Sequence, residues 1–248
     1  MSATRTLLET PQRGAAARAA AAPVRMPRMF TPRLYRRMQN GLGGSGAGRW
    51  LGFHVHVYIA AERDSLRHPA RPPRELRLGQ ETEAALPALA AVRPEPPERL
   101  RARFAAGHWC FAAWRADRCV AYLWAAPGPT ELTSQFGCSW RVPAGVVWIY
   151  DLFTVAGVIG AFGHLNQALW KGMGERLHLI AGQVELDNHA SRAAHASLGF
   201  RELGVIWSWR VGPWRWHCLC AQQPRRRCWR WGLAAVAPYD WMPVERGH

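Results

Sequence analysis

Residues 188–200, NHASRAAHASLGF, place several polar side chains at spacings that could bind and act on a ligand. The segment follows an apolar run typical of a strand. Its Ala-rich centre predicts a short helix that ends at Gly199, a residue suited to a left-handed C-cap. Asn188 could offer its side-chain amide to a ligand, or could cap the N-terminus of that helix. His195 could donate a proton near neutral pH, because an imidazole has an ordinary pKa of about 6.5. The alternative is a partly buried helix histidine with no catalytic role.

A single acid interrupts the apolar run 145–155, GVVWIYDLFTV. Burial would raise the pKa of the Asp151 carboxyl toward the range that suits a general base. The alternative is a structural salt bridge with one of the many arginines. Asp151 alternates with Tyr150 and Leu152, so the sequence leaves open which face of the strand it takes.

The elements that must position these residues follow from the period of the apolar pattern. Alternating or wholly apolar runs rich in β-branched and aromatic residues predict strands, and Ala- and Leu-rich stretches bounded by Pro or Gly predict helices. Together they predict an α+β sheet built from ββα and βαβ pieces. The predicted strands are 52–61, 74–79, 108–114, 119–126, 145–155, 177–186, 201–211 and 214–220, and the predicted helices are 81–92, 96–107, 164–175 and 190–199.

Four regions are expected along the chain. Residues 1–50 are Arg- and Ala-rich and end in a Gly/Ser linker, which predicts a basic, partly disordered arm. Residues 51–73 form a strand and a connector, residues 74–222 form the main domain, and residues 223–248 form an Arg/Trp-rich tail. Arg together with Trp suits an anionic membrane surface or a single-stranded nucleic acid.

The composition excludes some classes of protein. The net charge of +15 comes almost wholly from arginine, since Lys171 is the only lysine, and a GC-rich coding sequence gives the same bias without selection for nucleic-acid binding. The six cysteines show no paired spacing, so we expect thiols in a reducing compartment and predict no metal site. No apolar leader stands within residues 1–30. We therefore expect a cytoplasmic protein, which the tail could also bring to the inner membrane face.

The order of elements and one motif resemble the GCN5-related N-acetyltransferase (GNAT) superfamily between about residues 74 and 220. The motif is Asn188-x-x-Ser191-x-x-x-His195-x-x-x-Gly199-Phe200, where the family has Asn, a small residue, Tyr and Gly-Phe at the same spacings. The resemblance implies a mixed central sheet flanked by helices. It also implies that the strands 145–155 and 177–186 part at their C-terminal ends, where the pantetheine arm of an acyl-CoA enters.

The resemblance implies the site residues as well. His195 takes the place of the tyrosine that protonates the departing thiolate, and Asp151 is the best-placed acid for deprotonating an acceptor amine. The loop 157–165, GVIGAFGHL, departs from the family pattern because no window opens with Arg or Gln and ends with Gly or Ala. Its glycines still allow the close backbone approach that a pyrophosphate needs. The residues expected to bind acetyl-CoA are Phe153, Thr154, Val155, Gly160, Ala161, Phe162, Gly163, Asn188 and Ser191.

The function that the resemblance implies is N-acyl transfer from acetyl-CoA, or a similar acyl-CoA, to a small amine such as an amino sugar. One alternative is a catalytically inactive GNAT-like domain that binds a ligand through the same cleft. The other is a basic peripheral membrane or nucleic-acid-surface protein, with nucleic acid the less favoured partner.

Overall fold

The computed structural model describes residues 51–67, 75–133, 138–158, 160–174, 177–212, 214–221, 227–232 and 235–237. The predicted arm at residues 1–50 and most of the predicted tail at residues 223–248 lie outside the described residues. The membrane hypothesis depends on those two segments and stays a prediction. Within the described part of the chain, no helix combines the length and the apolar character needed to cross a membrane.

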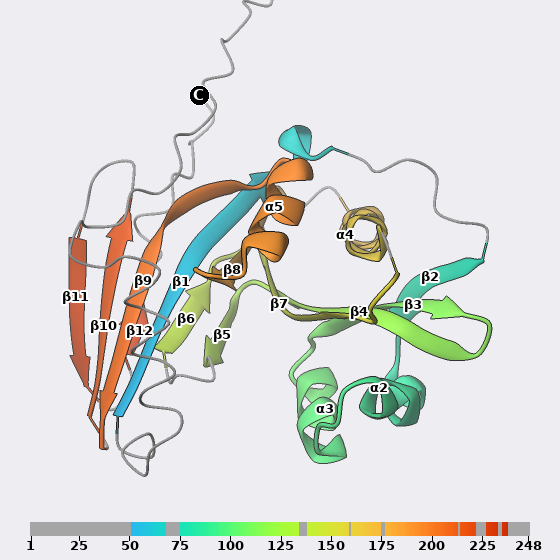
Figure 1. Ribbon diagram of the computed structural model, residues 1–248, viewed down its shortest axis with the longest axis horizontal. Helices are drawn as coiled ribbons and strands as arrows, with labels where there is room; N and C mark the ends of the chain where they lie inside the picture. The colour runs from blue at the N-terminus through green and yellow to red at the C-terminus, as the bar shows by residue number, and fades with distance from the viewer. Residues whose placement is uncertain are drawn as a thin grey trace, which may run out of the picture.

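A nine-stranded sheet forms the centre of the molecule, in the order β11-β10-β9-β1-β8-β7-β4-β3-β2 (Figure 1). All neighbouring strands in it are antiparallel except β7 and β8, which run parallel. The strands are β1 (Leu51–Glu62), β2 (Leu76–Glu81), β3 (Trp109–Arg115), β4 (Arg118–Pro127), β7 (Val146–Thr154), β8 (Leu179–Glu185), β9 (Arg201–Val211), β10 (Trp214–Ala221) and β11 (Arg227–Gly232).

The molecule also has a second, smaller sheet of three strands, in the order β12-β6-β5. Its strands are β5 (Thr130–Thr133), β6 (Cys138–Val142) and β12 (Ala235–Ala237). The segments 227–232 and 235–237, predicted as tail, therefore add strands to both sheets.

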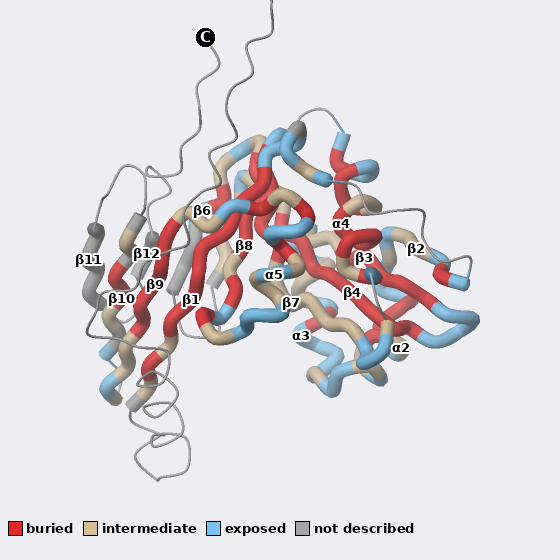
Figure 2. Tube along the Cα trace, turned by 45° about the horizontal axis from the view of Figure 1, so that its top comes forward, coloured by how far each residue is buried: buried red, intermediate tan, exposed pale blue. Residues whose placement is uncertain are grey.

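Helices cover both faces of the large sheet, because its strands alternate apolar side chains between two cores. The helices α4 (Ala161–Gly172) and α5 (His189–Ser197) lie over one face, and α2 (Leu86–Val92) and α3 (Pro97–Ala105) lie over the other, at the β2–β4 end (Figure 1). On β4, Leu123 belongs to the first core and Trp124 to the second. The strands β1, β3, β4 and β8 are buried for most of their length, whereas β7 is buried only in its first half (Figure 2).

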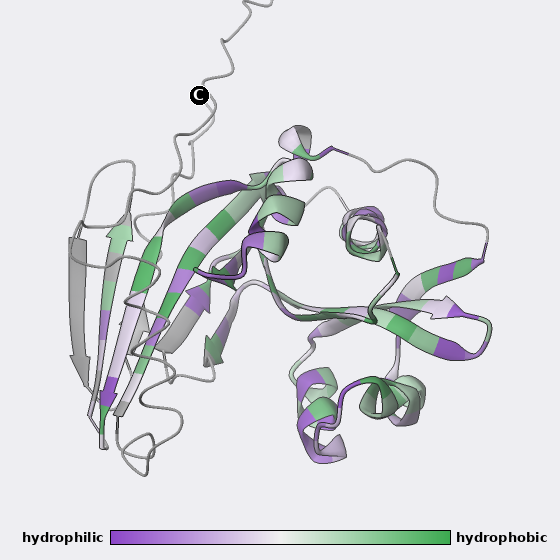
Figure 3. Ribbon diagram, viewed as in Figure 1, coloured by the Kyte–Doolittle hydropathy of each residue, from purple (hydrophilic) through white to green (hydrophobic). Residues whose placement is uncertain are grey.

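The fold class predicted from the sequence is confirmed: a mixed central α+β sheet is flanked by helices. Each predicted strand is present, but the predicted helix 81–92 is a short 3₁₀ turn, η3 (Glu83–Ala85), followed by the seven residues of α2. Pro87 lies in the first turn of α2, a position that suits a proline. Figure 3 shows hydrophilic residues along α3, which buries Leu100 against the sheet.

The strand β1 lies inside the large sheet rather than beside it. It pairs with β8 on one edge and with β9 on the other, both antiparallel. Residues 51–62, which the sequence places ahead of the main domain, therefore share a sheet with it and support β8, one side of the candidate site.

Candidate active site

The only parallel pair of the large sheet comes apart partway along. The strands β7 and β8 are paired from Val146 with Leu179 to Ile149 with Gly182, and no further. Beyond that point β7 stays paired with β4 and β8 stays paired with β1. Each strand therefore turns one unpaired backbone edge toward a wedge between them. A wedge at this place is what the resemblance implies for the runs 145–155 and 177–186.

A β-bulge in β7 accompanies the opening of the wedge. Tyr122 of β4 lies opposite Phe153, whereas Trp124 lies opposite Tyr150, so β7 carries one extra residue between the two pairs. Asp151 within this bulge has φ 45°, in the left-handed region that Asp tolerates better than most residues do. A bulge bends its strand and increases the local twist, which turns the end of β7 away from β8.

The wedge is a cleft of about 180 Å³. Side chains from four strands line its walls, and the start of α5 closes one end. The lining residues are Ile59, Leu123, Ile149, Tyr150, Asp151, Leu152, Gln183, Val184, Glu185, Asn188, Ser191 and His195. Four of the residues that the sequence predicts for the site are therefore brought together here: Asp151, Asn188, Ser191 and His195.

Asp151 is held by two arginines. Arg93 and Arg103 each donate from Nη1 to one of its carboxylate oxygens, at 2.6 Å, and Arg103 also donates to Glu95 at 2.8 Å. Burial alone would lower the pKa of Arg103, but Asp151, Tyr150 and Glu95 together more than offset this and the pKa is raised. These contacts correspond to the salt bridge that the sequence leaves open as the alternative to a general base.

His195 is buried beside the cleft, with 4% of its surface exposed. Its Nδ1 lies 2.7 Å from the backbone oxygen of Ser191, and its ring packs between those of Phe162 and Phe200, with centroids at 4.4 and 5.1 Å. Burial lowers the pKa of His195 to about 4, although the hydrogen bond to Ser191 acts in the opposite direction. The imidazole is therefore neutral at pH 7, with the Nδ1 hydrogen donated to the Ser191 carbonyl.

Asn188 caps α5, since its Oδ1 accepts a hydrogen bond from the backbone N–H of Ser191 at 3.0 Å. This is the capping role considered for Asn188. Because only Oδ1 is used in the cap, Asn188 still has an amide Nδ2 that can donate to a ligand in the cleft.

The other residues expected to bind the cofactor lie outside the cleft lining. Phe153 and Thr154 pair with β4, and the backbone groups of Val155 already have partners in Val120 and Val158. The glycine loop leads into α4, whose N-cap, Gly160, is exposed with φ 79°. The first residues of α4 complete the set: Ala161 and Gly163 are buried, and Phe162 packs on His195.

Four residues at the site were not predicted from the sequence: Tyr150, His108, Arg93 and Arg103. Tyr150 lines the cleft, and its hydroxyl lies 2.6 Å from Nδ1 of His108, a residue 42 positions away. The only sequence signal was the neighbouring position of Tyr150 and Asp151 in one apolar run. No local sequence pattern indicates that Tyr150 or Asp151 contacts the helix α3 or the start of β3.

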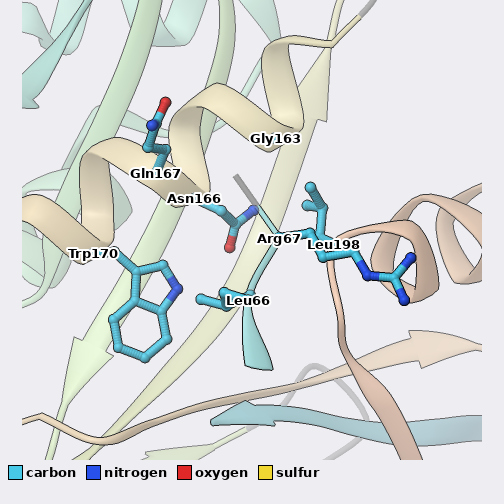
Figure 4. A pocket seen from close by; sticks show the side chains of 7 residues that line it. All are labelled: Leu66, Arg67, Gly163, Asn166, Gln167, Trp170 and Leu198. Carbon is cyan, nitrogen blue, oxygen red and sulfur yellow. The ribbon is translucent and has the colours of Figure 1, made fainter. Parts of the chain in front are cut away.

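A second, much smaller hollow of about 10 Å³ lies between α4 and the end of α5 (Figure 4). Asn166 and Trp170 project into it from successive turns of α4, on the side opposite Leu66 and Leu198. Asn166 donates from Nδ2 to the backbone oxygen of Phe162 at 3.0 Å. The volume suits one water molecule and no larger ligand. It is lined by Leu66, Arg67, Gly163, Asn166, Gln167, Trp170 and Leu198.

Comparisons with known proteins show similarity in structure only. No family model matches the chain, and no curated protein does. A conserved protein of unknown function from Staphylococcus epidermidis superposes with a TM-score of 0.48 at 10% identity, over 73% of this chain and 68% of that one. A protein from Novosphingobium aromaticivorans that is described as an acetyltransferase of the GNAT family superposes with a TM-score of 0.46 at 15% identity, over 65% of each chain.

A GCN5-related N-acetyltransferase from Kribbella flavida gives a TM-score of 0.44 at 14% identity, over 65% of this chain and 60% of that one. The chain thus spans between 60% and 68% of the length of these three structures. The strand order of the large sheet and the parting of β7 and β8 define the fold.

Proposed function

We propose that this protein is an N-acyltransferase that moves an acetyl or similar acyl group from acyl-CoA to a small amine. The observation that supports it is the wedge between β7 and β8. Two unpaired backbone edges face each other across a cleft, so an extended amide-bearing chain can bond there as an added strand would. The pantetheine arm of coenzyme A is such a chain, and its thioester would lie beside the side chains of β7 and α5.

The start of α4 suits the pyrophosphate of the same ligand. The first intrahelical bond of α4 runs from the N–H of His164 to the oxygen of Gly160, which leaves the N–H groups of residues 161–163 for a ligand. A Cβ at Gly160 would meet the His164 ring at 3.8 Å, and no atom of another segment lies within 4 Å of it. The departure from the family pattern at this loop removes a common Arg or Gln contact but not this backbone cradle.

An acyl-CoA supplies a thioester carbonyl that is already activated toward an amine. In this proposal His195 protonates the leaving sulfur through Nε2, since its Nδ1 is committed to Ser191. A lowered pKa makes the imidazolium scarce at neutral pH but a strong donor once formed. Asp151 stays in the site, and its two arginines favour a positioning role for the carboxylate over proton abstraction.

Acetyl-CoA is expected to bind the full chain, as measured by isothermal titration calorimetry. Ser191→Trp should weaken this binding at least about tenfold, because an indole at position 191 would fill the cleft that the pantetheine arm needs. Ser197→Trp is the matched control: Ser197 lies exposed on the same helix, and its replacement should leave the affinity unchanged. The absence of both heat and thermal shift at millimolar acetyl-CoA would remove the enzyme and favour the inactive, ligand-binding alternative.

His195→Phe should reduce acyl transfer by about 10² or more, in line with the loss of one positioned proton donor. The phenyl ring keeps the packing between Phe162 and Phe200, so the affinity for acetyl-CoA should change by less than about twofold. Steady-state kinetics with acetyl-CoA, together with the calorimetric affinity, separate the two effects. Unchanged turnover in this variant would withdraw the acid role from His195.

A further inference from the structure

Tyr150 and His108 form a close polar pair at the wall of the cleft. The Tyr150 hydroxyl lies 2.6 Å from Nδ1 of His108, and the two rings meet edge to face with centroids 5.6 Å apart. Tyr150 comes from β7 and lines the cleft, whereas His108 directly precedes β3 and lies behind it. Tyr150 therefore stands between the cleft and a titratable imidazole.

Both partners of this hydrogen bond are neutral at pH 7, so its direction depends on the tautomer of His108. Burial, and then the nearby Arg103 cation, lower the pKa of His108, so its imidazole is neutral at pH 7. Burial raises the pKa of Tyr150, so its phenol keeps its proton. In the tautomer that carries the imidazole hydrogen on Nε2, the Tyr150 O–H donates to Nδ1. The phenolic oxygen keeps lone pairs that can accept a proton from a molecule in the cleft.

The phenol is held in a rigid frame. The guanidinium of Arg103 lies 5.4 Å from the ring centroid of Tyr150 and 5.1 Å from that of Trp124. Asp151 and Glu95 fix the same guanidinium through hydrogen bonds. A positioned cation also stabilises negative charge that develops on the phenolic oxygen. The groups charged at neutral pH that face the pair are thus Arg103, Asp151 and Glu95.

We propose that Tyr150 is the catalytic residue that takes the proton from the acceptor amine and that His108 takes the tyrosine's own proton in the same step. This inference rests on the proposed function and supplies the base that it lacks. Both carboxylate oxygens of Asp151 already accept from guanidinium groups, whereas the Tyr150 oxygen has lone pairs free of such contacts.

The proposed acyl transfer conserves both protons and electron pairs. The amine nitrogen forms the C–N bond to the thioester carbonyl carbon, and one N–H proton passes to the Tyr150 oxygen. The Tyr150 proton passes to Nδ1 of His108, which becomes imidazolium. The C–S bond breaks with its electron pair on sulfur, which takes a proton from His195 or from water. His108 then returns its extra proton to water.

The test uses the full chain with acetyl-CoA as donor and glucosamine as the probe amine. Tyr150→Phe keeps the ring and its packing but removes the relay, so kcat should fall by about 10² while KM for acetyl-CoA changes by less than about twofold. His108→Gln should give a similar loss, and the double variant should be no slower than either, because the two groups act as one unit. Tyr58→Phe is the control: Tyr58 is fully buried on the opposite face of β1 from Ile59 and should keep full activity.

The dependence on pH distinguishes a relay from a structural pair. The ratio of the wild-type rate to the His108→Gln rate should fall at acidic pH as His108 becomes protonated, because His195 and the acceptor amine titrate in both proteins. A kcat for Tyr150→Phe within about threefold of wild type would overturn the relay. So would a ratio of the two rates that stays constant with pH.

A measurement that needs no acceptor amine tests the relay separately from the acyltransferase function. Nitrogen-15 NMR of the full chain should show His108 with its hydrogen on Nε2, and Tyr150→Phe should raise the pKa of His108 because the donor to Nδ1 is gone. A hydrogen on Nδ1 overturns the relay even if glucosamine is no substrate. Failure of acetyl-CoA to bind in calorimetry overturns the acyltransferase itself, whatever the NMR spectrum shows.

Discussion

Gly199→Ala is expected to lose about 2 to 5 kcal/mol of unfolding free energy, from about 1–2 kcal/mol of left-handed backbone strain and about 1–3 kcal/mol of overpacking. Gly199 follows α5 with φ 97°, in the region that disfavours a side chain. A Cβ there would stand 2.2 Å from the backbone oxygen of Ser65 and 3.1 Å from its carbonyl carbon. Because those atoms are backbone, relief requires moving the segment that ends β1 or the start of β9. The glycine of the Gly-Phe motif is therefore required by a close chain crossing as well as by the helix cap.

Urea unfolding of the variant measures this loss, and Gly107→Ala is its matched control. Gly107 has a similar φ of 76°, but a Cβ there would meet no atom within 4 Å. The control should therefore lose only about 1–2 kcal/mol, the backbone part alone. Equal losses at the two positions would contradict the contact with Ser65.

The folded protein is expected to lose stability steeply as the pH falls from about 6.5 toward 4. Burial lowers the pKa of His195 to about 4 and that of His56 to about 3, the latter helped by nearby His54. Above pH 6.5 these groups are neutral whether the chain is folded or not, so they add nothing to the pH dependence. Below it the unfolded chain binds protons that the folded chain rejects, and unfolding becomes easier. For His195 a shift of this size is worth on the order of 3 kcal/mol once the pH reaches 4.

Denaturant titrations between pH 7 and pH 4 test this expectation. His195→Phe should reduce the slope of unfolding free energy against pH by about one proton over that window. His189→Asn changes an exposed histidine at the start of the same helix and should leave the slope as it is in the wild type. A wild-type slope in His195→Phe would mean that burial of the imidazole does not oppose its protonation.

The strands and the cleft end of α5 could be predicted because their signals are local. Alternation over a few residues specifies a strand, and the spacing from Asn188 to Gly199 specifies one capped helix. The face of Asp151 could not be predicted, because the bulge at this residue breaks the period of two that such a prediction uses.

Contacts between distant segments could not be predicted either. The pair of Tyr150 with His108, and the two arginines on Asp151, join residues 42 to 58 positions apart. Hydrophobic periodicity says that each of these residues lies at an element end or on a strand. It does not say which elements become neighbours, and that choice determines the chemistry of the cleft wall.

The central position of β1 affects how the chain assembles. Both of its partners, β8 and β9, follow it by more than a hundred residues, since β1 ends at Glu62 and β8 begins at Leu179. During synthesis β1 leaves the ribosome early. Both of its edges lack their partners β8 and β9 until the last third of the chain has been made. The cleft wall formed by β8 is completed only then, so nascent chains are most exposed to chaperone capture and to aggregation before that late closure.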